Sequence, residues 1–171
     1  MAKRKSRSTR PVRTSRTKSA TTPSQAAPPP ASALTFLYIE SSALLAALLE
    51  HDASARAALR GAGRCITSAL TLAEATRGVL RARIASRLTP DQERRAIGAL
   101  KTFERRCTII RVTDSVLTRA GRPFPVEPIR TLDAIHLATA ELLGEAPQLV
   151  TVVTRDTRVR ENAQALGYVV A

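Results

Sequence analysis

Four acidic residues scattered along the chain could together form a divalent-cation site. They are Glu40, Glu74, Asp133 and Asp156. Carboxylates that converge repel one another unless a cation neutralises them, and oxygen ligands without a cluster of histidines or cysteines select Mg²⁺ or Mn²⁺ rather than Zn²⁺. Because Mg²⁺ keeps bound water and also binds phosphate oxygens, such a site is suited to hydrolysis of a phosphodiester.

Each of these acids also has a simpler interpretation. Glu40 could be a partly exposed acid at a strand end, and Asp133 and Asp156 could stabilise helix N-termini. Glu74 could pair with Arg77 on a solvated helix face. The cation-site prediction therefore depends on all four carboxylates meeting at one place.

Short apolar runs alternate with amphipathic stretches from Leu34 onward, which predicts one α/β domain with a parallel sheet covered on both faces. The strands are expected at residues 34–39, 65–67, 107–112, 148–154 and 168–170. The helices are expected near residues 41–50, 52–60, 69–86, 90–105, 113–121, 131–144 and 156–167. Ser41 or Ser42 is available to cap the first helix, while Thr113 and Gly121 are expected to begin and end the fifth.

These strand ends place three of the acids near one edge of the expected sheet. Glu40 directly follows the first strand, and Asp156 comes two residues after the fourth. Asp133 lies in the first turn of the helix that leads into the fourth strand, and Glu74 lies inside the third helix. Ligands of open α/β sheets bind beyond the carboxyl ends of the strands, so this edge is the expected site.

The net charge of +13 is concentrated in the first 33 residues. They hold eight Lys or Arg and no acid, which leaves 19 basic against 14 acidic residues from Leu34 onward. With almost nothing apolar to bury, residues 1–33 are expected to form a disordered tail. This tail could grip RNA, target the protein or serve as a nuclear-type patch, or it could have no specific role. The positive net charge of the whole chain favours a polyanionic partner.

Several other kinds of site are not supported. The chain has no GxxxxGK[ST] or GxGxxG loop, and its two histidines, His51 and His136, are too few for most metal-hydrolase sites. His136 lies three residues after Asp133 on one expected helix; packing or hydrogen bonding is favoured there over a catalytic role. Cys65 and Cys107 are expected to be free, buried thiols in a reducing cytoplasm. No apolar run has the length of a membrane span, and no secretory signal is recognisable, so a cytoplasmic protein is expected.

Four segments resemble the motifs of PIN-domain ribonucleases, and most closely those of the toxins of VapBC-type bacterial toxin–antitoxin pairs. They are YIESSALLAAL (38–48), SALTLAEATRG (68–78), IRTLDAIHLATA (129–140) and VTRDTRVRENAQALGY (153–168). The resemblance extends over essentially all of residues 34–171. It implies a PIN-like three-layer α/β/α fold with a mainly parallel five-stranded sheet and a cleft where the acids meet.

The resemblance also implies roles for individual residues. The acids of the family fall on Glu40, Glu74, Asp133 and Asp156, and Ser42 and Thr154 match polar positions that support them. We expect Mg²⁺, or Mn²⁺, on Glu40, Asp133 and Asp156, with Glu74 completing the cluster. The family cuts RNA, commonly as a homodimer, and a cognate antitoxin covers the cleft.

One position departs from the family's pattern. The first-strand acid is usually Asp, and the extra methylene of Glu40 carries its carboxylate about 1.5 Å further, which octahedral Mg²⁺ tolerates poorly. A PIN-like module that binds RNA or protein without cutting is therefore the alternative to an endoribonuclease, and DNA is the alternative substrate. Four arginines are candidates for binding phosphates of the nucleic acid: Arg77, Arg81, Arg155 and Arg158. Each could also be an ordinary solvated side chain.

Overall fold

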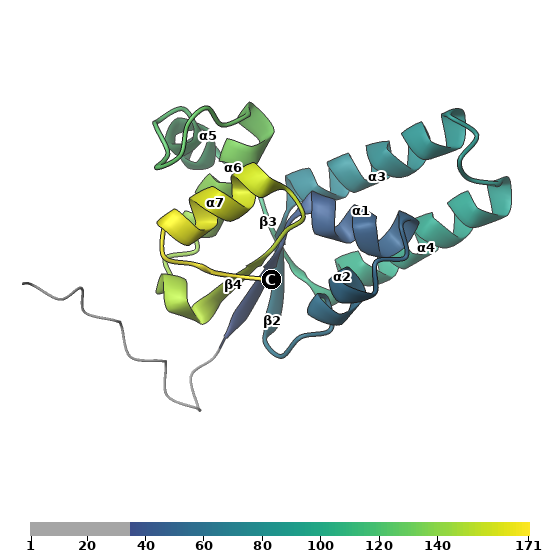
Figure 1. Cartoon of the computed structure of the whole chain (residues 1–171), viewed down its shortest axis with the longest axis horizontal. Coiled ribbons are helices and arrows are strands. Elements are labelled where there is room, and N and C mark those ends of the chain that lie inside the picture. The colour runs from purple at the N-terminus through teal and green to yellow at the C-terminus, as the bar shows by residue number, and fades with distance from the viewer. Residues whose placement is uncertain (1–34) are drawn as a thin grey trace, which may run out of the picture.

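Five short apolar segments form one parallel sheet in the computed structural model, which describes residues 35–171 (Figure 1). The strands are β1 Phe36–Ile39, β2 Arg64–Ser68, β3 Thr108–Ile110, β4 Val150–Val153 and β5 Val169–Val170, in the order β3-β2-β1-β4-β5. Every neighbouring pair is parallel, so the predicted fold class is confirmed. The predicted tail at residues 1–33 lies outside the described residues.

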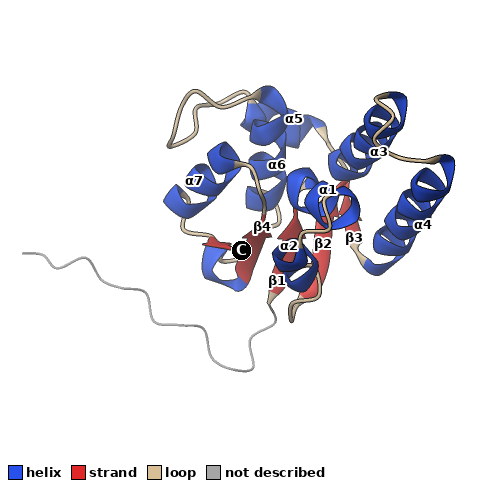
Figure 2. Cartoon of the chain, turned by 45° about the vertical axis from the view of Figure 1, so that its right-hand side comes forward, coloured by secondary structure: helices blue, strands red, loops and turns tan. Residues whose placement is uncertain are grey.

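Helices cover both faces of this sheet (Figure 2). The first group is α1 Ser41–Leu49, α2 Ala53–Ala58, α3 Ala69–Ile84 and α4 Pro90–Arg106, and the second is α5 Asp114–Ala120, α6 Thr131–Glu141 and α7 Thr157–Ala165; a short 3-10 helix, η1 Pro147–Leu149, precedes β4. A hydrophobic core lies on each face of the sheet, and alternate side chains of β1 enter one or the other. Tyr38 packs with residues of α5, α6 and α7, and Ile39 packs with residues of α1, α3 and α4. This alternation follows from the two-residue period of a strand and gives the predicted three layers. None of the helices in residues 35–171 is long and apolar enough to cross a membrane.

The helix ends follow local signals, with one exception at α1. Thr113 caps α5 by accepting a hydrogen bond from the Val116 amide, and Gly121 ends that helix, as predicted. The predicted cap of α1 by Ser41 or Ser42 is wrong, because both serines already lie within the helix and Glu40 is its N-cap. The Glu40 carboxylate accepts from the Ser42 amide at 3.0 Å, which satisfies a donor that the helix itself cannot pair.

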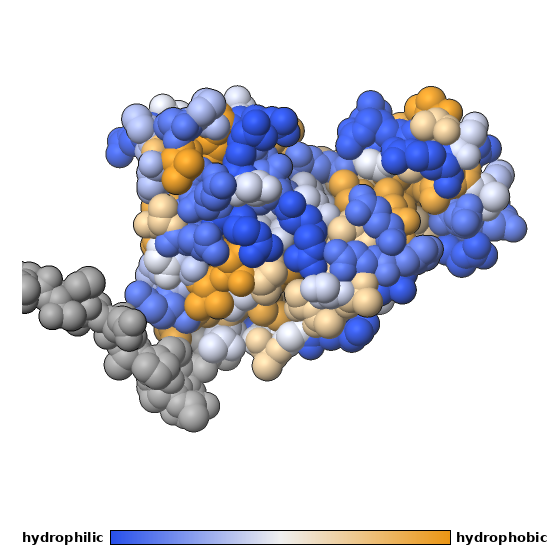
Figure 3. All heavy atoms as spheres, viewed as in Figure 1, coloured by the Kyte–Doolittle hydropathy of each residue, from blue (hydrophilic) through white to orange (hydrophobic). Residues whose placement is uncertain are grey.

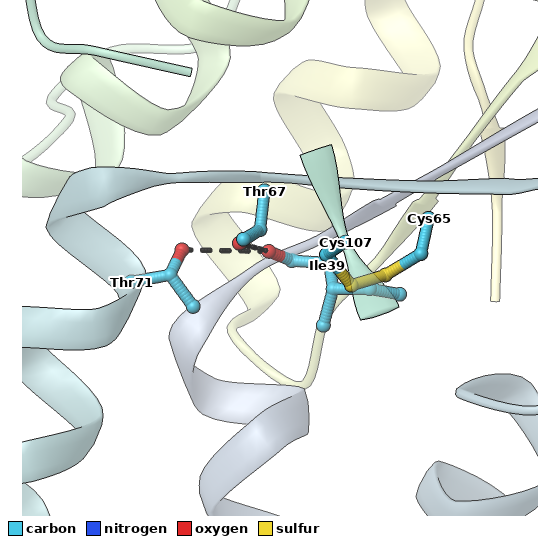
Figure 4. The surroundings of a disulfide bond; sticks show 5 residues. All are labelled: Ile39, Cys65, Thr67, Thr71 and Cys107. Atoms are coloured by element: carbon cyan, nitrogen blue, oxygen red, sulfur yellow. Dashed lines mark hydrogen bonds between the residues drawn. A yellow bond between two sulfur atoms is a disulfide. The ribbon is translucent and has the colours of Figure 1, made fainter. Parts of the chain in front are cut away.

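The prediction of two free thiols is also wrong, because Cys65 and Cys107 form a disulfide (Figure 4). In the pairing of β2 with β3, Ile66 lies opposite Thr108, so each cysteine immediately precedes a paired residue. This register brings the two Cα atoms to 4.6 Å, within the range that a disulfide spans. The cysteines are 42 residues apart in sequence, and strand pairing alone makes them neighbours.

Two buried threonines fix the end of β1 just before Glu40 (Figure 4). Thr67 Oγ1 on β2 and Thr71 Oγ1 on α3 both donate to the Ile39 carbonyl, at 2.6 and 3.4 Å. The last residue of β1 is therefore held by its neighbouring strand and by the helix that carries Glu74.

Candidate functional site

The predicted acids meet where β1 and β4 end. Ile39 is paired with Val153, and the Glu40 amide donates to the Val153 carbonyl at 3.0 Å. The chain leaves β1 towards β2 and leaves β4 towards β5, and ligands of open α/β sheets bind at such a switch point. Glu40 and the segment 154–156 begin at this switch point, while α3 and α6 bring in Glu74 and Asp133.

Glu40 is a buried carboxylate surrounded by hydrogen-bond donors; its exposed fraction is 3%. Its Oε1 accepts from Ser41 Oγ at 2.6 Å. Its Oε2 accepts from the Ser42 amide at 3.0 Å, from Thr154 Oγ1 at 2.9 Å and from Ser42 Oγ in a short contact. A charge taken out of water is costly unless it is paired or hydrogen-bonded, and these four donors offset that cost.

Ser42 and Thr154 also hold the turn between β4 and α7. Ser42 Oγ accepts from the Arg155 amide at 2.7 Å and from the Asp156 amide at 3.1 Å, and Thr154 Oγ1 accepts from the Asp156 amide at 3.0 Å. The same two hydroxyl groups therefore contact Glu40 and fix the backbone of Asp156. Their supporting role stays a prediction, and both hydroxyl groups lie where they could serve it.

Asp156 is the N-cap of α7 as well as a member of the acidic group. Its Oδ1 accepts from the Arg158 and Val159 amides at 2.8 and 3.2 Å. The simpler interpretation, stabilisation of a helix N-terminus, therefore applies to this oxygen. Cap bonds of this kind fix the carboxylate, and here they use only Oδ1.

Asp133, in the first turn of α6, carries the clearest sign of a missing positive partner. Its Oδ2 is buried and has no hydrogen-bond partner among the described residues. Burial raises the pKa of Asp133, and the negative charges of Asp156 and Glu40 raise it further. An unpaired buried oxygen beside two other carboxylates is where a cation would be most stabilising.

Glu74 is linked to the other acids through His136, which is almost fully buried. His136 Nε2 lies 2.7 Å from Glu74 Oε2 and 3.7 Å from Glu40 Oε1, and Nδ1 lies 3.3 Å from the Tyr38 hydroxyl. Burial raises the pKa of Glu74, but the hydrogen bond and charge of His136, with smaller effects of Ser41 and Arg81, bring it below its ordinary value. The prediction that His136 forms a hydrogen bond is confirmed.

The sequence favoured packing over a catalytic role for His136, although its spacing from Asp133 was a signal for the site. His136 follows Asp133 by three residues on α6, which puts the two side chains on one helix face. Tyr38 gave no such signal, since a tyrosine in an apolar strand is an ordinary core residue.

The four predicted phosphate-gripping arginines do not share one environment. Arg77, Arg81 and Arg158 are exposed. Arg155 is instead bound to the protein: its guanidinium donates to Asp52 Oδ2 at 3.0 Å, Ser54 Oγ at 3.2 Å and its neighbour's carbonyl at 3.2 Å. Arg155 therefore ties the β4–α7 turn to the start of α2, and most of its donors are already used.

Comparisons with known proteins agree with this fold. A family model described as PIN domain matches residues 37–165. The chain is 34% identical over 142 residues to Ribonuclease VapC35 of Mycobacterium tuberculosis, covering 78% of this chain and 94% of that protein. It is 38% identical over 136 residues to Ribonuclease VapC46 of the same species, covering 78% and 95%. The chain therefore belongs to the PIN-domain family, among its VapC-type ribonucleases, as predicted.

A solved structure shares the fold. It is VapBC2 from Rickettsia felis bound to a DNA fragment from their promoter, with a TM-score of 0.56 and 16% identity over 80% of this chain and 98% of that chain. At this identity the likeness concerns the fold alone.

Proposed function

We propose that this chain is a metal-dependent endoribonuclease and the toxin of a VapBC-type toxin–antitoxin pair. The observation that carries the proposal is the buried, unpartnered Oδ2 of Asp133 beside the charges of Asp156 and Glu40. The ribonuclease names of VapC35 and VapC46 support the reaction class.

The acidic residues at the switch point between β1 and β4 suit a hard divalent cation, Mg²⁺ or Mn²⁺. Asp133, Asp156 and Glu40 would hold it with carboxylate oxygens, and Glu74 would complete the negative group. When bound, such an ion supplies an activated water and neutralises charge that develops on the phosphate. The chain's own contribution is to fix the carboxylates, through the hydroxyl groups of Ser42 and Thr154.

RNA would be held by exposed basic side chains close to the acidic group in sequence. Arg77 and Arg81 follow Glu74 on α3, and Arg158 follows Asp156 on α7. Figure 3 shows hydrophilic side chains, interrupted by hydrophobic ones, over α5 and α7, and the hydrophilic ones suit contact with a polar backbone. The phosphates of RNA and DNA are alike, so the choice between them needs a direct comparison.

The protein partner that we propose is a cognate antitoxin, because the similar solved structure is named as VapBC2, a toxin–antitoxin pair. A groove of about 820 Å³ lies among α1, α2 and α4 and offers a surface for it. Its lining includes apolar Leu44, Leu48 and Phe103 as well as Arg56 and Arg95. An amphipathic helix with acidic residues would match both features. We also propose a homodimer that acts in the cytoplasm, by analogy with the family.

The second candidate function is a PIN-like module that binds RNA or protein with little or no cleavage. The hydrogen bonding of Glu40 favours it, because both carboxylate oxygens are already engaged by the four donors described above. Ligation of a cation by Glu40 would require some of these donors to be released.

Cleavage of RNA by the purified full chain separates the two candidates. We expect cleavage with Mg²⁺, none with EDTA, and none for Asp133→Asn. Asp114→Asn is the matched control, because Asp114 also lies in the first turn of a helix but is exposed. Cleavage that persists in EDTA would exclude the metal mechanism. RNA binding without cleavage would favour the second candidate function. Preferential cleavage of DNA would show that DNA, and not RNA, is the substrate.

A further inference from the structure

His136 brings a nitrogen ligand into the acidic site at a distance that suits a shared metal ion. Single ligand atoms of Glu40, Glu74 and His136 all lie within 4.8 Å of one another. These three side chains come from the end of β1, from α3 and from α6, so only the tertiary fold assembles them. His136 and Glu40 also lie near Asp133, since His136 follows Asp133 by three residues on α6 and the charge of Glu40 affects the pKa of Asp133.

The distances within this group are close to those around one ion. Ligand bonds of about 2.1 Å at right angles separate neighbouring ligand atoms by about 3.0 Å. His136 Nε2 lies 2.7 Å from Glu74 Oε2 and 3.7 Å from Glu40 Oε1, which bracket that value. Small side-chain movements, together with rotation of the Ser41 hydroxyl away from Glu40 Oε1, would therefore admit an ion between them.

Tyr38 provides the second interaction that a ligating histidine needs. A metal-bound imidazole almost always donates its other N–H to a fixed acceptor, which sets the tautomer and the ring orientation. The Tyr38 hydroxyl, 3.3 Å from His136 Nδ1, can be that acceptor. The Tyr38 side chain is 1% exposed, so the acceptor is rigid. With the proton on Nδ1, the Nε2 lone pair points towards the two carboxylates.

We propose that His136 ligates a divalent cation through Nε2, together with Glu40 and Glu74, at a position beside Asp133 and Asp156. Imidazole binds first-row transition-metal ions, a series that begins with Mn²⁺, better than it binds Mg²⁺, so this position favours Mn²⁺ over Mg²⁺. The inference rests on the proposed function for the existence of a cation site. It adds a ligand, and a metal preference, that an all-carboxylate site would not have.

Electron spin-echo spectroscopy of the Mn²⁺-loaded full chain tests the ligand directly, in protein freed of any histidine tag. Nitrogen bound to Mn²⁺ modulates the echo, and replacing all histidines by ¹⁵N-histidine shifts that modulation without changing any side chain. The chain has only two histidines, His51 and His136. His51→Asn is the matched control, since His51 is exposed and its backbone φ of 56° suits asparagine.

We expect a histidine ¹⁴N signal in the wild type and in His51→Asn, and its loss in a folded His136→Gln. Tyr38→Phe should keep the signal and raise the Mn²⁺ Kd about tenfold, the effect of losing an outer hydrogen bond to a ligand. Mn²⁺ binding without histidine coupling would overturn the inference and leave the proposed function intact. If histidine nitrogen couples to Mn²⁺ but RNA is cleaved equally well in EDTA, His136 remains a metal ligand and the proposed function is overturned. Failure to bind Mn²⁺ would overturn the inference.

Discussion

Thr154 Oγ1 donates to Glu40 Oε2 at 2.9 Å and so joins the ends of β1 and β4 inside the candidate site. Both side chains are buried. Glu40 is thereby a structural residue, as the cap of α1 and the partner of Thr154, as well as a candidate ligand. Its position depends on hydroxyl groups that approach it from both strand ends.

Thr154→Val should lower the stability of the protein, because it removes a donor to a buried carboxylate while keeping the side-chain shape. We expect the free energy of unfolding to fall by about 1–3 kcal/mol. Urea unfolding in EDTA measures it. Thr118→Val, on the exposed surface of α5, is the control and should change stability by less than about 0.5 kcal/mol. Equal stability of the two variants would contradict the role of this contact.

Asp133 should make the metal-free protein less stable as the pH rises. Burial, followed by the charges of Asp156 and Glu40, raises the pKa of Asp133 in the folded chain. A carboxyl group with a raised folded pKa binds more protons when folded, so its contribution to stability falls as pH climbs from the unfolded to the folded pKa.

Asp133→Asn should therefore flatten that part of the stability profile and be more stable than the wild type at pH 7 in EDTA. Urea unfolding at several values between about pH 4 and pH 7 covers the interval above the ordinary aspartate pKa. Asp114→Asn should retain the wild-type profile. Parallel curves for the wild type and Asp133→Asn would show that Asp133 is not destabilised by its surroundings.

Arg155 should matter for stability more than for RNA binding, because its guanidinium is bound to Asp52 and Ser54. The Arg155 and Asp52 side chains are 25% and 29% exposed, so their ion pair is partly screened by solvent and should couple only weakly. A double-mutant cycle of Arg155→Ala with Asp52→Ala measures this coupling. We expect Arg77→Ala or Arg158→Ala to weaken RNA binding more, and the reverse order would make Arg155 a phosphate ligand.

Reduction of the Cys65–Cys107 disulfide should destabilise the chain, because the bridge restricts a long loop in the unfolded state. For cysteines 42 residues apart, the chain-entropy estimate is about 4 kcal/mol. Urea unfolding of Cys65→Ser/Cys107→Ser, or with a dithiol reductant, measures the loss. Thiol titration of the unreduced protein should find no free thiol among these cysteines, and two titratable thiols would restore the original prediction.

Local sequence determined much of this protein. Apolar runs of strand length, helical periodicity and signals such as Thr113 and Gly121 act over a few residues, so the elements and the α/β class could be predicted. The placement of Glu40 after β1 and Asp156 after β4 followed from the same pattern. The family resemblance assigned Glu74, which local pattern alone left beside an apolar stripe.

Tertiary structure decided the contacts made across the sheet. The register of β2 with β3 joins Cys65 to Cys107, and the packing of α6 against β1 and α3 places His136 between Tyr38 and Glu74. The ion pair of Arg155 with Asp52 likewise joins residues 103 positions apart in the sequence. Sequence periodicity reports which face of an element is buried, but not which side chains of other elements meet it, because that depends on register and packing fixed only when the whole chain folds.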